Sequence, residues 1–218
     1  MELRCSAFLF DLDGVLVDSQ AVVERTWRRW AERHRLDADA ILRMAHGRRT
    51  SDTLKDAAPH LAPHAIADEV EWLDATELAD IEGLRVVPGA SQLLSALPAE
   101  RWAIVTSCGR ALARRRLQSV GLPLPEVLVV SEDVTKGKPA PDGYRLAAAR
   151  LGYEAAACVV FEDAPAGVAA GRAAGARVVG LTTSYLAVDL LDTEATIPDF
   201  ASIQVRPDDD VLVLTVRL

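Results

Sequence analysis

The chain contains little cysteine and no long apolar run. Its three cysteines, Cys5, Cys108 and Cys158, are odd in number, lie far apart and form no C-x-x-C pair, which argues against a disulfide framework and a zinc site. No apolar run approaches the roughly 18 residues that a membrane helix needs. The apolar stretch near the start, CSAFLFDLDGVLVD, lacks a basic leader and is interrupted by Asp11 and Asp13. We therefore expect neither a membrane anchor nor a signal peptide. We expect a cytoplasmic protein with reduced thiols.

Lysine and net positive charge are also scarce. Of the 24 basic residues only Lys55, Lys136 and Lys138 are lysines, and 32 acidic residues leave a formal charge of −8. This acidic balance disfavours a nucleic-acid-binding surface. The 218 residues, half of them hydrophobic, suit one domain or one domain with a sizeable insertion. We expect a monomer without nucleic-acid or membrane partners.

Short, continuous apolar runs alternate with alanine-rich helical patterns. Such runs are typical of strands buried on both faces, and their alternation with helices predicts an α/β fold with a parallel sheet between two helical layers. The predicted strands are Ala7–Phe10, Trp102–Val105, Val127–Val130, Cys158–Phe161 and Arg177–Leu181. Helices are predicted over Arg110–Val120, Pro141–Leu151 and Ala166–Ala174.

Two segments depart from this alternation. The stretch from about Gln20 to Arg85 has helical but no strand periodicity, so we interpret it as a helical insertion after the first strand. The tail, IQVRPDDDVLVLTVRL, has two β-rich arms around Pro207 and three aspartates, which predicts a terminal hairpin.

Polar residues follow four of the predicted strands where each strand ends. In an open α/β sheet, ligands bind at the carboxyl ends of the strands. The residues concerned are Asp11, Asp13 and Gly14 after the first strand, Thr106 and Ser107 after the second, Lys138 beyond the third, and Glu162 and Asp163 after the fourth. A single such aspartate is usually a turn or cap residue, but four together indicate a site for a phosphate group and a divalent cation.

Four strings carry a resemblance to a known family. FLFDLDGVLVDS, IVTSCG, KGKPAPDGY and FEDAPAGVAAG resemble, in order, the four signature motifs of the haloacid dehalogenase superfamily of phosphotransferases. The resemblance covers about residues 7–181. It implies a Rossmann-like core, residues 1–18 and 87–218, and a small α-helical cap, residues 19–86, inserted after the first strand.

Charge supports a metal independently of the resemblance. A phosphomonoester dianion beside Asp11, Asp13, Glu162 and Asp163 would crowd like charges, and each pair at ~4 Å costs roughly 4 kcal/mol at an effective dielectric constant near 20. Hard oxygen ligands favour Mg²⁺, and crowding raises the pKa of a neighbouring carboxyl group. We therefore expect Mg²⁺, a contribution from Lys138, and one neutral carboxyl group.

The resemblance assigns chemical roles to these residues. It implies that Asp11 attacks phosphorus to form an aspartyl-phosphate and that Asp13 is the general acid and base. Asp11, the Asp13 carbonyl and Asp163 would ligate Mg²⁺, with Glu162 bound either directly or through water.

Thr106 and Lys138 would hold the phosphoryl oxygens. Lys138 is notable because this chain uses arginine almost everywhere else, and a compact ammonium fits a crowded carboxylate site better than a guanidinium.

The cap contains a candidate specificity loop. The string HGRRTSDTL resembles the loop of the branch that includes sugar, hexitol and yeast-type glycerol phosphatases. We therefore expect Arg48, Arg49, Thr50 and Asp52 to contact a phosphorylated sugar or polyol, whose hydroxyl groups suit side chains of mixed donor and acceptor character. Gly14 and Ser107 are the substrate-binding candidates of the core.

Several other features have simpler interpretations. Cys108 has no adjoining histidine in any matching motif, so we interpret it as a small buried residue. The histidines at 60 and 64 are interrupted by prolines and are expected at the surface. The cluster Arg110, Arg114, Arg115 and Arg116 is expected to be a solvated helix face.

The main functional prediction is hydrolysis of small sugar or polyol phosphates, and two alternatives stay open. A β-phosphoglucomutase-like activity has equally good core motifs, but Val23 stands where that mutase has a cap histidine. The second alternative is a non-catalytic member of the family that binds a sugar phosphate or a protein. The presence of Asp13 argues against dehalogenation, and Lys55, the only cap lysine, lies outside the place expected for Schiff-base chemistry on a phosphonate.

Overall fold

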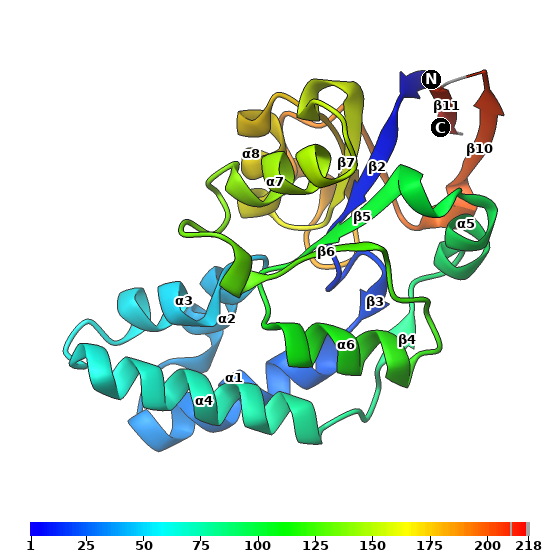
Figure 1. Cartoon of the computed structure of the whole chain (residues 1–218). Helices are drawn as coiled ribbons and strands as arrows, with labels where there is room; N and C mark the ends of the chain where they lie inside the picture. The colour runs from blue at the N-terminus through cyan, green and yellow to red at the C-terminus, as the bar shows by residue number, and fades with distance from the viewer. Residues whose placement is uncertain (210, 217–218) are drawn as a thin grey trace.

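A six-stranded parallel sheet forms the centre of the computed structural model, which describes residues 1–209 and 211–216 (Figure 1). The strand order is β6-β5-β2-β7-β8-β9. The strands are β2 (Ala7–Phe10), β5 (Trp102–Val105), β6 (Val127–Val129), β7 (Cys158–Glu162), β8 (Arg177–Leu181) and β9 (Ala195–Ile197). β2 therefore lies in the middle, between β5 and β7, and all five pairings are parallel.

Helices cover both faces of this sheet because alternate residues of its strands point to opposite sides. Phe8 and Phe10 of β2 belong to the apolar core that includes α5 and α6, whereas Ala7 and Leu9 belong to the core that includes α7 and α8. The helices are α5 (Ala90–Ala96), α6 (Arg110–Ser119), α7 (Asp142–Arg150) and α8 (Pro165–Ala174). The α/β fold with three layers is thereby confirmed.

Four further helices form a separate bundle between the short strands β3 (Val17–Asp18) and β4 (Arg85–Val86), which pair antiparallel (Figure 1). They are α1 (Gln20–His34), α2 (Ala38–Ala45), α3 (Thr50–Ala57) and α4 (Pro63–Ala79). The bundle has its own apolar core, centred on Trp27, Trp30 and Leu54. The insertion is thus helical as expected, and the division at residues 18/19 and 86/87 stays a prediction.

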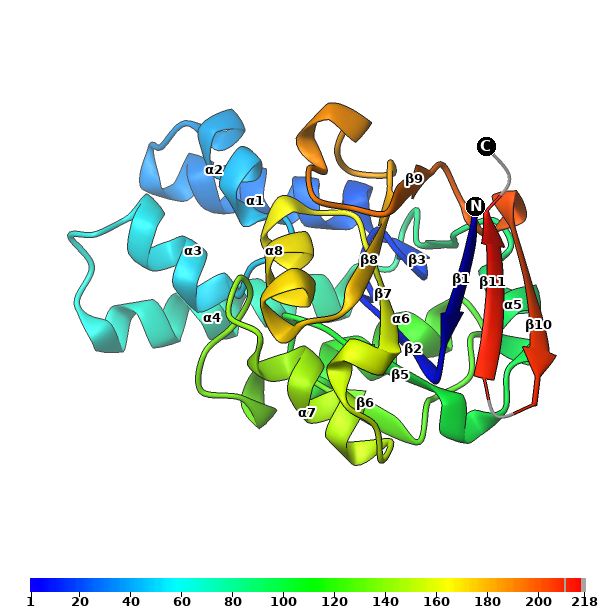
Figure 2. The same ribbon diagram turned by 90° about the horizontal axis from the view of Figure 1, so that it is seen from above.

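A second, antiparallel sheet lies at the end of the molecule remote from the bundle (Figure 2). Its order is β1-β11-β10, with β1 (Glu2–Cys5), β10 (Ile203–Asp208) and β11 (Val211–Val216). The terminal hairpin is confirmed by the pairing of β10 with β11, while Asp210 and residues 217–218 lie outside the described residues. Strand β1, which pairs with β11 across almost the whole chain length, was not predicted from the sequence.

The remaining regular segments are short 3₁₀ turns at Ala99–Arg101, Ser131–Asp133, Ala155–Ala157, Ala187–Asp189 and Phe200–Ser202. Within the described residues, the longest helices are too polar or too short to cross a bilayer.

Candidate active site

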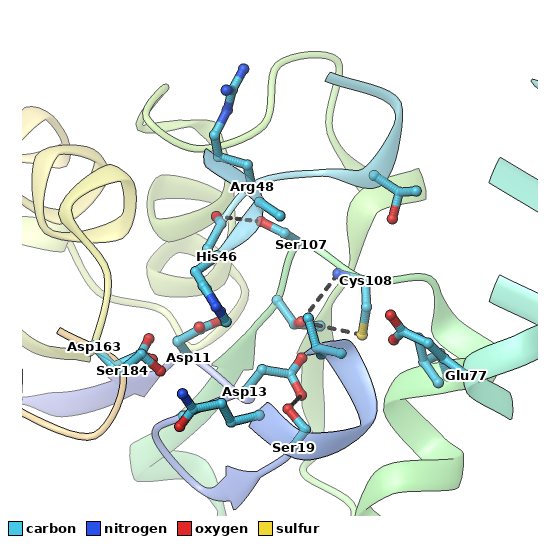
Figure 3. A pocket seen from close by; sticks show the side chains of 18 of the residues that line it. Asp11, Asp13, Ser19, His46, Arg48, Glu77, Ser107, Cys108, Asp163 and Ser184 are labelled. Carbon is cyan, nitrogen blue, oxygen red and sulfur yellow. Dashed lines mark hydrogen bonds between the residues drawn. The ribbon is translucent and has the colours of Figure 1, made fainter. Parts of the chain in front are cut away.

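Three neighbouring strands end at one cavity between the sheet and the helical bundle (Figure 3). The sheet ladder continues one residue beyond β2 and β5, because the Asp11 amide donates to the Phe161 carbonyl at 3.0 Å and the Thr106 amide to the Val129 carbonyl at 2.9 Å. These bonds fix the backbone from which the polar side chains project. Six predicted core residues line the cavity, namely Asp11, Asp13, Gly14, Thr106, Ser107 and Asp163.

A buried cluster of three carboxylates lies at the base of this cavity. Oxygens of Asp11, Glu162 and Asp163 all lie within 4.8 Å of one another. Burial raises the pKa of Asp11 to about 7, and the Glu162 and Asp13 charges act in the same direction, against Lys138. Burial, followed by the Glu162 and Asp11 charges, likewise raises the pKa of Asp163. Without a cation, burial and mutual repulsion therefore favour the neutral forms of Asp11 and Asp163. The neutral group that the resemblance implies is Asp13, and that expectation stays a prediction.

Lys138 is the basic residue in contact with this cluster. Its Nζ lies 2.6 Å from Asp11 Oδ1 and 2.6 Å from Glu162 Oε1, and it also donates to the Val105 carbonyl at 3.2 Å. Burial alone would lower the pKa of the Lys138 ammonium, but Asp11 and Glu162 together hold it above its ordinary value. Lys138 is therefore a fixed positive charge beside Asp11.

Glu162 is the completely buried member of the cluster. Its Oε1 also accepts from the Tyr144 hydroxyl at 2.5 Å, and its Oε2 accepts from the Asp163 amide at 3.1 Å. A side chain at position 167 would collide with this carboxylate, so only glycine fits there. Protein donors thus engage both oxygens of Glu162, whereas Asp11 and Asp163 face the cavity.

These residues fit a divalent cation. When all three carboxyl groups are ionised, the single Lys138 ammonium leaves two negative charges of the cluster uncompensated. Oxygen ligands of this kind bind hard cations such as Mg²⁺. Gly14, with a left-handed φ of 75°, passes so close to Asp163 that any Cβ would collide with its carboxylate.

Asp13 lies beside the cluster and has both oxygens engaged. Its Oδ1 accepts from the Ser19 hydroxyl at 2.7 Å and its Oδ2 from Arg116 Nη1 at 2.5 Å (Figure 3 shows the Ser19 contact). Arg116 also donates to Glu77 of α4. The carboxyl group of Asp13 therefore has a defined orientation.

The prediction that Arg116 belongs to a solvated basic face is wrong. Its side chain is 4% exposed and lines the cavity. Arg116 shares the buried face of α6 with Leu112, Ala113 and Leu117, so helical packing carries it inward, while Arg114 and Arg115 are exposed as expected. Burial would lower the pKa of its guanidinium, but Asp13 and Glu77 hold it above its ordinary value.

Thr106, Ser107 and Cys108 form the second edge of the cavity. The Thr106 hydroxyl accepts from the Cys108 amide at 3.2 Å, and the Ser107 hydroxyl donates to the Gly47 carbonyl of the bundle at 3.0 Å. Burial raises the pKa of the Cys108 thiol to about 12, so it is unsuited to act as a thiolate nucleophile. Cys108 is half-buried at the cavity edge rather than fully buried as predicted, and its raised pKa fits the prediction that it is not a nucleophile.

The four predicted specificity residues are placed differently. Arg48 and Thr50 line the cavity, although the Arg48 guanidinium pairs with Asp56 at 2.6 Å and extends away from Asp11 (Figure 3). Arg49 instead donates to the Val134 and Thr135 carbonyls of the core, at 2.6 and 3.1 Å. Asp52 pairs with Lys55 at 3.1 Å, and its side chain is not part of the cavity lining.

Besides Arg116, four polar residues of the cavity and one buried partner of Glu162 were not predicted. His46, Gln20 and Glu77 contribute from the bundle and Ser184 from the loop after β8, and Tyr144 supports Glu162 from α7. His46 lies within the HGRR string but was not singled out. Burial raises the pKa of Glu77 to about 7 even though Arg116 opposes this shift. Burial lowers the pKa of His46, so its imidazole favours the neutral form.

The chain is similar to known hydrolases over most of its length. A family model described as haloacid dehalogenase-like hydrolase matches residues 5–175. Hexitol phosphatase A of Escherichia coli is 41% identical, with 97% of this chain and all of the relative covered. Glycerol-1-phosphate phosphohydrolase 2 of Saccharomyces cerevisiae is 35% identical, with 85% and 78% covered. The crystal structure of a hydrolase from Pseudomonas syringae superimposes with a TM-score of 0.82 at 27% identity, covering 89% of this chain and 94% of that one.

Proposed function

Since the chain belongs to the haloacid dehalogenase-like hydrolases and its relatives mark it as a phosphoric monoester hydrolase, we propose that it hydrolyses small sugar or polyol phosphates with Mg²⁺, through a phosphorylated aspartate. The observation that carries this proposal is the buried cluster of Asp11, Glu162 and Asp163 with Lys138 in contact. It provides a nucleophile and a metal site at the cavity, and a fixed positive charge in direct contact with the nucleophile.

The first step is attack by a carboxylate oxygen of Asp11 on phosphorus. The Asp11 O–P bond forms while the bond from phosphorus to the ester oxygen breaks, and Asp13 donates its proton to that oxygen as the alcohol departs. In the second step Asp13 takes a proton from a water molecule that attacks the phosphorus. The Asp11 O–P bond then breaks and orthophosphate is released.

The metal belongs at the carboxylate cluster. Asp11, Asp163 and the Asp13 carbonyl would hold it, while Glu162, engaged by Lys138, Tyr144 and a backbone amide, is better suited to orient Lys138 than to bind the ion. When bound there, Mg²⁺ would compensate negative charge during phosphoryl transfer.

Phosphoryl binding falls to Lys138, Thr106 and Ser107. Lys138 Nζ lies 2.6 Å from Asp11 Oδ1. From there it could contact an oxygen of a phosphoryl group bound beside the nucleophile. The Thr106 side chain lines the same cavity with a hydroxyl donor. Lys138 and Thr106 would together compensate charge that develops on the equatorial oxygens.

The helical bundle is proposed to act as the cap, residues 19–86. It supplies polar groups opposite the carboxylates, among them Arg48, Thr50, His46 and Gln20. Hydroxyl, imidazole and amide groups of this kind can both donate to and accept from a polyol. The names of the hexitol and glycerol phosphatases support the same substrate class.

Mutase chemistry is less well supported. Val23 lines the cavity at the position where the mutase branch has a proton-carrying histidine, and a valine cannot transfer a proton. β-Glucose 1-phosphate with a trace of the bisphosphate separates the two activities. Release of orthophosphate supports the hydrolase, and formation of glucose 6-phosphate would replace this proposal by the mutase.

The direct test is turnover of p-nitrophenyl phosphate and of a panel of phosphorylated sugars and polyols with Mg²⁺. Wild-type protein should release phosphate, EDTA should prevent it, and Asp11→Asn should abolish it. Asp68→Asn, an exposed substitution on α4, is the matched control and should retain activity. Turnover that survives Asp11→Asn contradicts the mechanism, and no turnover by wild type would favour a binding protein without catalysis.

A further inference from the structure

Arg116 links the acid and base residue of the core to the helical bundle. One terminal nitrogen of its guanidinium donates to Asp13 Oδ2 at 2.5 Å and the other to Glu77 Oε2. Arg116 lies on α6 of the core, Glu77 lies in the last turn of α4, and these two helices are packed together. The bridge lies at the cavity, because both side chains line it and are only 4% and 11% exposed.

Stability alone does not account for an arginine at this position. Its neighbours on the buried face of α6 are Leu112, Ala113 and Leu117, so an apolar side chain would continue an apolar face. A buried ion pair often contributes no more stability than well-packed apolar residues of similar volume. An apolar side chain of similar volume would serve stability at position 116 equally well. The buried charge of Arg116 therefore indicates a function in the cavity.

The geometry around Asp13 indicates what that function is. The Ser19 hydroxyl, just before α1, donates to one carboxyl oxygen of Asp13, and Arg116 of α6 donates to the other. Two fixed donors on two oxygens leave the carboxyl group a single orientation, and proton transfer depends steeply on such alignment. The guanidinium can contact two carboxylates at once because its N–H groups form a planar fork, whereas an ammonium is a point charge.

We propose that Arg116 is a positioning residue for both proton transfers of Asp13 and that Glu77 of the bundle anchors its guanidinium. This inference rests on the phosphatase mechanism proposed above. Arg116 itself keeps its proton throughout. The proton moves from Asp13 to the departing ester oxygen in the first step and from water to Asp13 in the second, so Arg116 acts only through the alignment of that carboxyl group.

The dependence of the rate on the leaving group tests this role. An alkoxide needs the proton from Asp13, whereas p-nitrophenolate departs without one because nitrophenol is far more acidic than an alcohol. The ratio kcat/KM reports the steps up to the departure of the leaving group, so it isolates the first transfer. Glycerol 1-phosphate and p-nitrophenyl phosphate are the two probes, and Arg116→Lys and Glu77→Gln are the variants.

We expect Arg116→Lys to lower kcat/KM for glycerol 1-phosphate by roughly 30–100-fold, part of the 10²–10⁴-fold that general acid catalysis contributes, and for p-nitrophenyl phosphate by less than about 5-fold. Glu77→Gln keeps an oxygen acceptor for the guanidinium and should show the same pattern at roughly 3–10-fold. Arg115→Lys, exposed on the same helix, is the matched control and should match wild type. Thermal melting of each variant reports whether it folds.

A double variant separates positioning from structure. If Arg116 acts through Asp13, then adding Arg116→Lys to Asp13→Asn should cause no further loss of kcat/KM for glycerol 1-phosphate. Equal losses on both probes, or additive losses in the double variant, would overturn the inference while leaving the phosphatase intact. Failure of wild-type protein to hydrolyse either probe would instead reject the proposed function on which the inference depends.

Discussion

Substitution of Asp163 by asparagine should stabilise the metal-free protein and remove its response to Mg²⁺. Oxygens of Asp163 lie within 4.8 Å of Asp11 and Glu162, and at an effective dielectric constant near 20 each ionised pair at that distance costs about 3 kcal/mol. The raised pKa values of Asp11 and Asp163 mean that bound protons already relieve part of this repulsion near neutral pH. We therefore expect Asp163→Asn to gain roughly 2 kcal/mol without metal, which raises Tm by roughly 4–8 °C in a chain of this size.

The assay is thermal unfolding in EDTA and in Mg²⁺. At a Mg²⁺ concentration about 100 times Kd, wild-type protein should gain roughly 2.7 kcal/mol and a correspondingly higher Tm. Asp163→Asn should shift by less than about 2 °C, and Asp68→Asn should behave as wild type. A metal-free variant that is less stable than metal-free wild type, or one that keeps the full Mg²⁺ shift, would refute the assignment of a strained metal site.

Three further predictions follow from the same site. Lys138→Arg should fold but lose activity by about 100-fold or more, because the wider guanidinium does not fit between the two buried carboxylates; comparable kcat in the variant would be inconsistent with a phosphoryl contact. Glu77 has a folded pKa of about 7, above its usual 4.5, so its ionisation destabilises the fold as pH rises through this window. Glu77→Gln should therefore gain up to about 3 kcal/mol relative to wild type between pH 5 and 8 in urea unfolding, and a pH-independent difference would show that Glu77 does not titrate there. Arg48→Ala should change the order of preference across the sugar and polyol panel while sparing p-nitrophenyl phosphate, and equal losses on all substrates would argue against a specificity role.

Continuous apolar runs made five of the six strands of the central sheet predictable, whereas the three-residue edge strand β9 was not predicted. Trp102–Val105 and Arg177–Leu181 are strands with the predicted bounds, because a strand buried on both faces needs apolar side chains in succession. The catalytic candidates followed from the same fact, since the residues after such strands share one edge of the sheet. Local sequence does not encode the partner of β11, so the addition of β1 to the terminal hairpin was not predictable from its four residues.

The position of Arg116 could not be predicted from its charge alone. Charge alone assigned it to the surface with Arg114 and Arg115, yet its spacing of four and three residues from Leu112 and Ala113 puts it on the apolar face of α6. The helical periodicity of the sequence therefore indicated that Arg116 is buried. Glu77 carried no comparable signal, because its contact with α6 depends on how the helical bundle packs against the core.

Specificity was the least predictable part of the site. The HGRR string correctly marked a loop at the cavity, but adjacent residues diverge, since Arg48 lines the cavity whereas Arg49 binds backbone carbonyls of the core. Which side chain of such a turn faces the substrate is set by tertiary contacts such as that of Ser107 with Gly47.

The central claim is that Asp11 carries the phosphoryl group during turnover. The most direct test is an acid-quenched single turnover of p-nitrophenyl phosphate by Asp13→Asn, followed by peptide mass spectrometry. The nitrophenolate departs without a proton from Asp13, whereas the later attack of water is slowed. The account predicts the mass increment of one phosphoryl group on the peptide that contains Asp11, and its absence in Asp11→Asn. Phosphate release without a modified peptide, or with the phosphoryl group on another residue, would contradict it.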